Sequence, residues 1–112
     1  MSLHENLLIN YFNFFSKKDL QGLKNMFSDD ITLIDWEILE SGIENVTKAN
    51  ENIFNSINTI EVTLLNVYKE DNQNNFSCEI EIIINGNELL KVIDVICFDK
   101  NDKINLISAY KQ

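Results

Sequence analysis

The chain contains no arginine, no proline and a single histidine, His4, and these absences narrow its chemistry. Without arginine, no guanidinium group is available to hold a phosphate or carboxylate substrate through two parallel hydrogen bonds. One histidine and two distant cysteines, Cys78 and Cys97, give too few nitrogen and sulfur ligands for a zinc site, so neither metal nor cofactor is expected. Both cysteines fall inside strand patterns, which predicts buried, reduced thiols.

Long apolar runs and basic clusters are also missing. No hydrophobic stretch approaches the ~20 residues that cross a bilayer, and no basic start followed by an apolar block precedes Gln21. We therefore expect no membrane partner, no signal peptide and a cytoplasmic location. The net charge is −9 and the largest basic cluster is Lys17-Lys18, so phosphate backbones are repelled and nucleic acid is not an expected partner.

What the sequence does contain indicates one globular domain over residues 1–112, because 45% of the residues are hydrophobic. Helical spacing of apolar residues predicts a first helix over 3–15, a short second helix capped by Asp19, and a third ending near Ile57. Ser41 and Glu44 fit a capping box at the start of the third helix. Strands are expected over 31–36, 60–69, 75–84, 88–98 and 103–110, with a turn at 28–30 and a loop over 37–42.

The order of these elements predicts an α+β fold. Asn85-Gly86 indicates a two-residue type I′ hairpin, and the later strands are joined by short turns, so the sheet is expected to be mainly antiparallel. Three helices can cover only one face of such a sheet. A strongly curved sheet wrapped round the first helix would form a cone with an apolar pocket.

Asp94 and Asp35 are acids on strand faces that are otherwise apolar. Side chains alternate along a strand, so Asp94 shares a face with Val92, Ile96 and their neighbours, and Asp35 follows the phase of Leu33. An ionised carboxylate in such a place must be paired, hydrated or protonated. Each acid either lines a pocket and takes part in chemistry or makes structural hydrogen bonds.

Tyr11 lies among apolar residues of the first predicted helix, where an aromatic residue usually belongs to the core. A buried phenol needs a hydrogen-bond partner, and Asp94 is the candidate. Trp36 points away from Asp35 if the strand is regular, which would favour a subunit interface, whereas a kink would turn it toward the lip of the pocket. His4 is expected to be exposed at the start of its helix.

Several short segments, taken in order, resemble the nuclear transport factor 2-like (NTF2-like) superfamily, which includes ketosteroid isomerases and SnoaL-type polyketide cyclases. The segments are Asp19-Leu20-Gln21-Gly22-Leu23, Met26-Phe27-Ser28-Asp29-Asp30-Ile31-Thr32, Ser41-Gly42, and Val95-Ile96-Cys97-Phe98-Asp99 leading to Lys103-Ile104. The resemblance covers nearly the whole chain and implies the cone-shaped, cystatin-like α+β fold.

The resemblance also implies roles for three residues. Asp35 falls at the position of the carboxylate that moves the proton, although Trp36 follows it where isomerases of this type commonly have proline. Tyr11 and Asp94 fall at the positions of the tyrosine and the protonated acid that hydrogen-bond the enolate oxygen. Further residues expected to line the pocket are Phe15, Trp36, Phe54, Val92 and Ile96. Epoxide hydrolysis in this superfamily needs an Asp-Arg-Asp arrangement, and dehydration needs inward histidines, so neither is expected here.

The expected function is therefore an isomerase or cyclase reaction on a small apolar carbonyl compound. In one alternative, the pocket binds a ligand without catalysis or the sheet binds a partner. In another, Phe12, Phe15 and Phe54 fill the cone and the chain only dimerises. The superfamily often pairs two subunits through the outer sheet face, so a homodimer is expected, with Thr63, Leu65 and Ile83 as candidate contacts.

Overall fold

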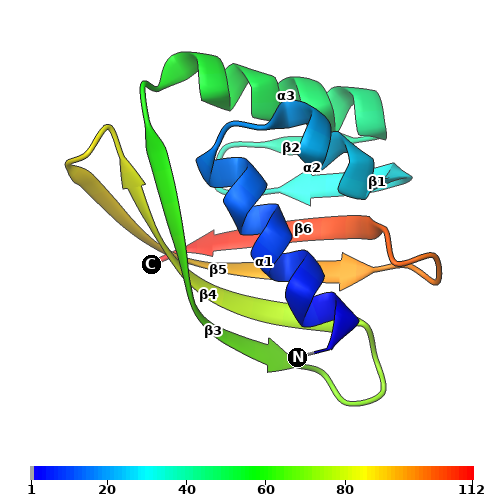
Figure 1. Ribbon diagram of the computed structural model, residues 1–112. Coiled ribbons are helices and arrows are strands. Elements are labelled where there is room, and N and C mark those ends of the chain that lie inside the picture. The colour runs from blue at the N-terminus through cyan, green and yellow to red at the C-terminus, as the bar shows by residue number, and fades with distance from the viewer. Residues whose placement is uncertain (1) are drawn as a thin grey trace.

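A computed structural model describes residues 2–112 and contains three helices and a six-stranded sheet. The elements in chain order are α1 (Leu3–Ser16), α2 (Leu20–Met26), β1 (Phe27–Ile34), β2 (Leu39–Ser41), α3 (Ile43–Ser56), β3 (Ile60–Lys69), β4 (Asn75–Ile84), β5 (Glu88–Phe98) and β6 (Ile104–Lys111). Figure 1 shows the helices on one side of a curved sheet, with α1 crossing it and α3 lying over one end. The predicted α+β class is confirmed.

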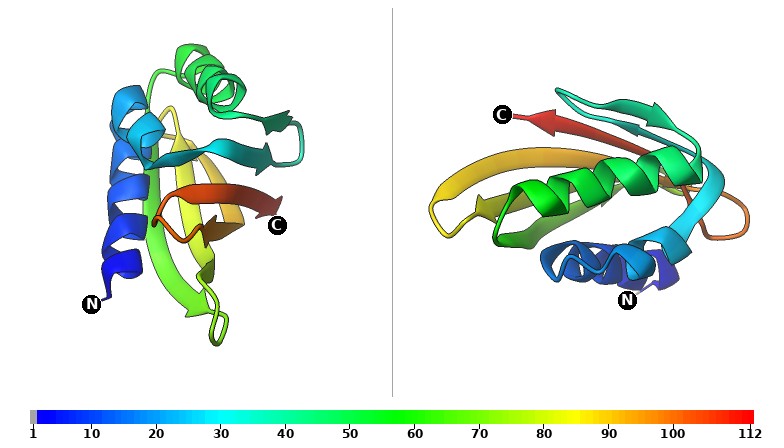
Figure 2. Two further views of the ribbon diagram at one scale, coloured as in Figure 1. Left: turned by 90° about the vertical axis from the view of Figure 1, so that its right-hand side faces the viewer. Right: turned by 90° about the horizontal axis from the view of Figure 1, so that it is seen from above.

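The strand order is β2-β1-β6-β5-β4-β3. All neighbouring strands pair antiparallel except β1 and β6, which run parallel, so the sheet is mixed but mainly antiparallel, as expected. The two views in Figure 2 show that β3, β4 and β5 bend strongly while the helices stay on the concave side. The curvature leaves room between the sheet, α1 and α3.

The core lies between the helices and the concave face of the sheet. Leu8 and Phe12 of α1 are buried against strand residues that include Ile31, Ile96 and Ile107. Burial of such side chains is the main stabilising contribution, about 1.5–3 kcal/mol for each fully buried large aliphatic side chain. Among residues 2–112, no helix combines the length and the apolar character needed to cross a bilayer.

Several local predictions agree with the structure. Asp19 caps α2, since its Oδ1 accepts a hydrogen bond from the backbone N–H of Gly22 at 2.9 Å. Asn85 and Gly86 both have positive φ angles, 52° and 76°, as a type I′ turn requires. Asn85 also joins this turn to the start of β3, because its Oδ1 accepts hydrogen bonds from the backbone N–H groups of Asn58 and Thr59.

Other local predictions were wrong. The stretch Ser28–Asp30 is not a turn but part of β1, where the register with β6 shifts between Phe27 and Thr32. Ser41 does not cap α3: it ends β2, and Gly42 takes the N-cap position with a φ of 90° and no side-chain hydrogen bond. Part of the predicted loop 37–42 thus forms a short edge strand.

Candidate functional site

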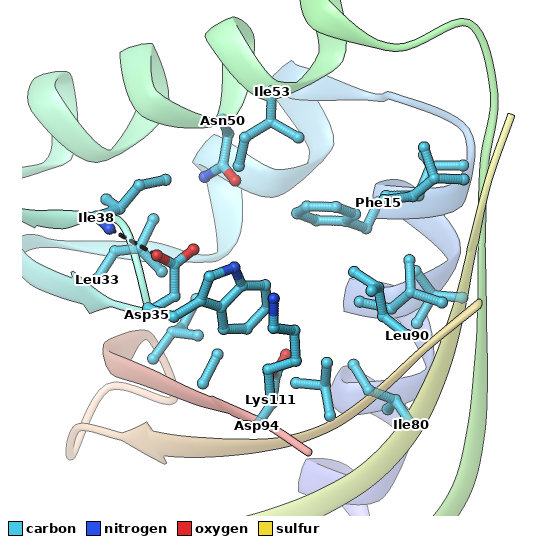
Figure 3. Close-up of a pocket in the computed structure, with 18 of the residues that line it drawn as sticks. Phe15, Leu33, Asp35, Ile38, Asn50, Ile53, Ile80, Leu90, Asp94 and Lys111 are labelled. Atoms are coloured by element: carbon cyan, nitrogen blue, oxygen red, sulfur yellow. Dashed lines mark hydrogen bonds between the residues drawn. The ribbon is translucent and has the colours of Figure 1, made fainter. Parts of the chain in front are cut away.

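A pocket with a volume of about 350 Å³ opens between the concave face of the sheet, α1, α3 and the loop that follows β1. Most of its wall is aliphatic or aromatic, with Phe15, Ile53, Ile80 and Leu90 among the contributors. Figure 3 shows side chains from α1, α3 and several strands converging on this space. The charged residues of the lining are Asp35, Glu37, Glu88, Asp94 and Lys111.

Asp35 is held at the pocket by the loop that follows β1. Its Oδ1 accepts hydrogen bonds from the backbone N–H groups of Glu37 and Ile38, with N···O distances of 2.7 and 2.6 Å. Its own N–H donates to the carbonyl of Ile38 at 2.9 Å, which closes the turn. An aspartate that bonds the backbone two and three residues ahead stabilises a tight turn. The side chain is half-buried and reaches the pocket lining.

The same turn changes the direction of Trp36. Because β1 ends at Ile34, two residues earlier than predicted, the alternation of a regular strand does not extend to Trp36. Trp36 therefore lines the pocket together with Asp35, which agrees with the kinked alternative and with the predicted lining residues, whereas the alternative based on a regular strand is wrong. Its side chain is 42% exposed, and Nζ of Lys111 lies 5.1 Å from the centre of its ring.

Asp94 is a buried acid on the concave face of β5. It pairs with Cys78 of β4 on one side and with Ala109 of β6 on the other, and is only 8% exposed. Burial, and secondly the negative charge of Asp35, raise the pKa of Asp94 to about 7. A substantial fraction of Asp94 is therefore protonated near neutral pH, so the side chain is available as a proton donor.

Tyr11 approaches the pocket from α1 and is 3% exposed. Its ring contacts those of Phe12 and Phe15, with centroids 5.1 and 6.1 Å away. Burial raises the pKa of Tyr11 well above its ordinary value, and the charges of Asp94 and Cys78 add to this, so the phenol keeps its proton. Within residues 2–112 no hydrogen bond joins Tyr11 to Asp94, so the expected direct partnership is not found.

Two other predicted lining residues lie outside the pocket. Phe15 and Val92 line it as expected, but Phe54 and Ile96 do not. Phe54 is buried in the core, with its ring 5.0 Å from that of Phe15, and Ile96 is fully buried. Ile96 lies two residues beyond Asp94 on β5 and belongs to the buried core together with Leu8 and Phe12 of α1. The alternation of side chains along β5 predicts which face of the sheet a residue occupies. It does not predict how far the cavity extends along that face.

Asn50 and Lys111 line the pocket although neither was predicted as a site residue. Asn50 is a polar residue on the apolar side of α3, and its side chain is 2% exposed. Its place among the apolar residues of that side was visible in the helical spacing of the sequence. Lys111 continues the inward phase of Ile107 and Ala109 on β6, but a lysine at the end of a strand is usually solvent-exposed. Its direction toward Trp36 depends on the loop after β1.

His4 and the two cysteines are not part of the pocket lining, although Cys78 is the cross-strand partner of Asp94. His4 is not freely exposed as expected: its ring lies 4.7 Å from that of Phe98 by centroid, and its Nε2 is 2.9 Å from Oδ1 of Asp102. Both cysteines are free thiols, with Cys78 buried and Cys97 half-buried. In the described part of the chain, no group of three histidine, cysteine or acidic side chains is arranged to hold a metal ion.

No protein-family model and no curated protein sequence matches the chain. Solved structures do match. A SnoaL-like family protein from Agrobacterium tumefaciens strain C58 is 12% identical, with a TM-score of 0.84, over 100% of this chain and 99% of the other. An NTF2-like protein of unknown function from Cytophaga hutchinsonii is 12% identical, with a TM-score of 0.81, over 100% and 92%.

A third similar structure is a protein with a ketosteroid isomerase-like fold from Catenulispora acidiphila, in complex with trimethylamine. It is 14% identical, with a TM-score of 0.79, and the match covers 92% of this chain and 82% of that one. Identities at this level carry information about the fold and not about the reaction. The chain therefore has the NTF2-like fold shared by SnoaL-like and ketosteroid isomerase-like proteins.

Proposed function

We propose that the chain is a small-molecule pocket protein of the ketosteroid isomerase type, which moves a proton next to the carbonyl group of a small apolar substrate. The observation that carries this proposal is that Tyr11, Asp35 and Asp94, which are remote in sequence, line one largely apolar pocket. A base and two hydrogen-bond donors facing an apolar cavity are the groups that this reaction needs.

In the proposed reaction, Asp35 removes a proton from the carbon next to the carbonyl group. The electron pair of that C–H bond moves onto the carbonyl oxygen, giving an enolate. The phenol of Tyr11 and the protonated carboxyl of Asp94 donate hydrogen bonds to this oxygen. When the substrate carries a double bond between its β and γ carbons, this ion is a dienolate. Asp35 then returns the proton to the γ carbon, the double bond moves to the α and β carbons, and the carbonyl group is restored without any co-reactant.

The pocket supports these roles through its geometry and its apolar wall. The loop after β1 fixes Asp35 through two backbone hydrogen bonds to a single carboxylate oxygen, so Oδ2 stays available for proton transfer. Burial keeps Tyr11 protonated and holds the pKa of Asp94 at about 7. Loss of one preorganised donor to a developing oxyanion typically raises the barrier by about 3–4 kcal/mol.

The test uses cyclohex-3-enone, a one-ring ketone whose isomerisation to the conjugated cyclohex-2-enone is followed by ultraviolet absorbance. We expect the wild-type protein to accelerate the reaction and Asp35→Asn to abolish the acceleration with an unchanged circular dichroism spectrum. Asp29→Asn is the matched control, because Asp29 is an exposed acid of β1, the strand before the Asp35 loop, and is not part of the lining. Full activity in Asp35→Asn, or no acceleration by the wild type, would reject the proposal.

A second candidate function is ligand binding without catalysis. It is favoured because no side-chain hydrogen bond within residues 2–112 fixes the Tyr11 phenol or the Asp94 carboxyl, whereas an oxyanion site depends on preorganised donors. The trimethylamine complex of the protein from Catenulispora acidiphila gives a precedent for a bound small molecule on this fold. Tight binding of a small apolar compound by both the wild type and Asp35→Asn, with no turnover by either, would select this function.

We also propose a homodimer formed through the convex face of the sheet. Leu89, Ile93 and Tyr110 alternate with the inward-facing residues of β5 and β6 and are 52%, 36% and 61% exposed. Ile93 pairs with Tyr110 across the two strands, so these two apolar side chains are direct neighbours, while Lys91 lies between Leu89 and Ile93 on the same face. Exposed apolar patches of this kind mark interaction surfaces.

A further inference from the structure

The deep part of the pocket contains hydrogen-bond acceptors that lack donors. Asn50 uses its Nδ2 to donate to the carbonyl of Val46 at 3.1 Å, which leaves its Oδ1 without a donor among the hydrogen bonds of residues 2–112. The carboxyl of Asp94 likewise has no hydrogen-bond partner in the described part of the chain, although the residue is 8% exposed. Asp35 uses Oδ1 for its turn and keeps Oδ2 free.

These acceptors come from three different elements and face one cavity. Figure 3 shows Asn50 reaching down from α3 and Asp35 on the loop after β1, with Asp94 on the sheet below. All three line the pocket. Among residues 2–112, Thr47 Oγ1 is the one enclosed side-chain atom that lacks a hydrogen-bond partner, so the free oxygens of these three residues open onto the cavity. Polar groups of buried residues are normally satisfied, so unpaired acceptors that open onto one cavity indicate a ligand or water that donates hydrogen bonds.

The charge of the lining favours a positively charged donor. Its ionisable acids are Asp35, Glu37, Glu88 and Asp94, against one lysine, Lys111. Ion pairs in residues 2–112 do not include Lys111. Its ammonium group lies instead over the ring of Trp36, 5.1 Å from the centre, in a cation–π arrangement. The protein thus already places one alkylammonium group at the edge of the pocket.

We propose that this pocket binds a small protonated alkylamine. The ammonium N–H groups donate to the free oxygens of Asp94, Asn50 and Asp35, and the hydrocarbon part lies against the apolar wall formed by residues such as Phe15 and Ile80. Lys111 is a competitor held at the mouth, because its own ammonium group occupies the Trp36 face and repels a second cation. This inference goes beyond proton transfer and does not depend on it, since an inactive pocket with these acceptors binds the same ligand.

The protonation of Asp94 provides an independent readout. The ionisable groups that interact with Asp94 are Asp35 on the loop after β1, Tyr11 on α1 and Cys78 on β4. Glu37, Glu88 and Lys111 are the other charged groups of the lining. An ammonium ligand stabilises the ionised carboxylate, so binding releases a proton when Asp94 begins protonated. With the pKa of Asp94 at about 7 and the amine protonated throughout, affinity should rise about tenfold from pH 6 to pH 8.

The experiment is isothermal titration calorimetry with cyclohexylmethylamine, and with cyclohexylmethanol as a neutral control of nearly the same shape. We expect the amine to bind at least tenfold more tightly than the alcohol at pH 8. Titrations at pH 6.5 in two buffers with different ionisation enthalpies should show proton release for the amine and none for the alcohol. Equal affinities for the two compounds, or no binding of the amine at millimolar concentrations, would overturn the proposal.

Two variants separate this proposal from non-specific attraction to an acidic protein. Asp94→Asn should weaken amine binding at least tenfold and remove the proton release, whereas Lys111→Met should strengthen binding about threefold or more by removing the resident cation. Asp94→Asn preserves side-chain volume, and a thermal melt verifies its fold; Asn50→Asp, which adds a carboxylate among the acceptors, is the second variant and should tighten binding. Unchanged affinity in Asp94→Asn and Asn50→Asp would contradict the assigned site. Turnover of cyclohex-3-enone is measured separately, so failure of either proposal is recognised on its own.

Discussion

In addition to burial, which is the larger cause, the charge of Asp35 raises the pKa of Asp94, although the two residues are 59 positions apart in the sequence. Asp35 lies on the loop after β1, and Asp94 lies on β5, which is separated from β1 in the sheet by β6. The curvature of the sheet and the turn that ends β1 bring both carboxyl groups to one pocket. Two acids in different surroundings can take different roles, one as the base and the other as the proton donor.

The raised pKa of Asp94 predicts that stability falls as pH rises. Between the unfolded value of 3.8 and the folded value of about 7, the native state binds more protons than the unfolded state, so the free energy of unfolding decreases with increasing pH. The Asp94 contribution is fully present below pH 4 and is lost as pH rises through about 7, a total of roughly 4 kcal/mol. Urea unfolding at pH 4.5 and pH 7.5 measures this change.

The control for this prediction is Asp94→Asn, which keeps the shape of the side chain but cannot titrate. The difference in unfolding free energy between the wild type and Asp94→Asn should move in favour of the variant by a few kcal/mol from pH 4.5 to pH 7.5. A difference that stays constant over this range would show that Asp94 titrates normally, and the proton-donor role would then lose its basis.

Replacements of Asp35 should separate its structural role from its chemical one. Asp35→Asn retains an oxygen that accepts from the N–H groups of Glu37 and Ile38, so its unfolding free energy should stay within about 1 kcal/mol of the wild type. Asp35→Ala removes the acceptor and should lose about 1–3 kcal/mol. Equal stabilities for the two variants in urea unfolding would show that the turn does not depend on these hydrogen bonds.

Gly22 is required by the close approach of α1 and α2. A Cβ atom at this position would lie 2.9 Å from the ring of Phe14 and 2.8 Å from Oδ2 of Asp19, the residue that caps α2. Gly22→Ala should therefore destabilise the protein by roughly 1 kcal/mol or more, despite the ~1 kcal/mol that alanine gains over glycine in a helix. Gln21→Ala, at an exposed position of the same helix, should change the melting temperature little.

The elements that could be predicted are those whose signals are local. Asp19 marks the start of α2, Asn85-Gly86 marks the hairpin between β4 and β5, and alternating residues define both of those strands. β2 has three exposed residues and no alternation, so nothing local predicts it. Ser41 and Glu44 fit a capping box, yet the N-cap of α3 is Gly42, which has a positive φ angle. A matching motif therefore does not by itself establish which residue caps the helix.

The residues of the candidate site were likewise predictable only where their signals are local or come from the family resemblance. Strand phase and the family resemblance predicted Tyr11, Asp35 and Asp94, and all three line the pocket. The position of Trp36 depended on where β1 ends, which is set by backbone hydrogen bonds to Asp35 that no periodicity reveals. The position of Lys111 depends on that same turn, because its ammonium group contacts the Trp36 ring. When a neighbouring loop determines where a side chain points, the alternation pattern of the residue's own strand cannot predict that it lines the pocket.

The convex face of the sheet leads to a last prediction, on assembly. Ile93 is 36% exposed on this face and pairs there with the exposed Tyr110. A lysine at this position in a dimer would bury an ammonium group against apolar side chains, which costs several kcal/mol unless it is paired. Ile93→Lys should therefore shift the protein from dimer to monomer in sedimentation velocity. The control Asn55→Lys gains the same charge at an exposed position of α3, on the other side of the sheet, and should leave the assembly unchanged. A wild-type protein that sediments as a monomer at 100 µM would show that this face does not pair two copies of the chain.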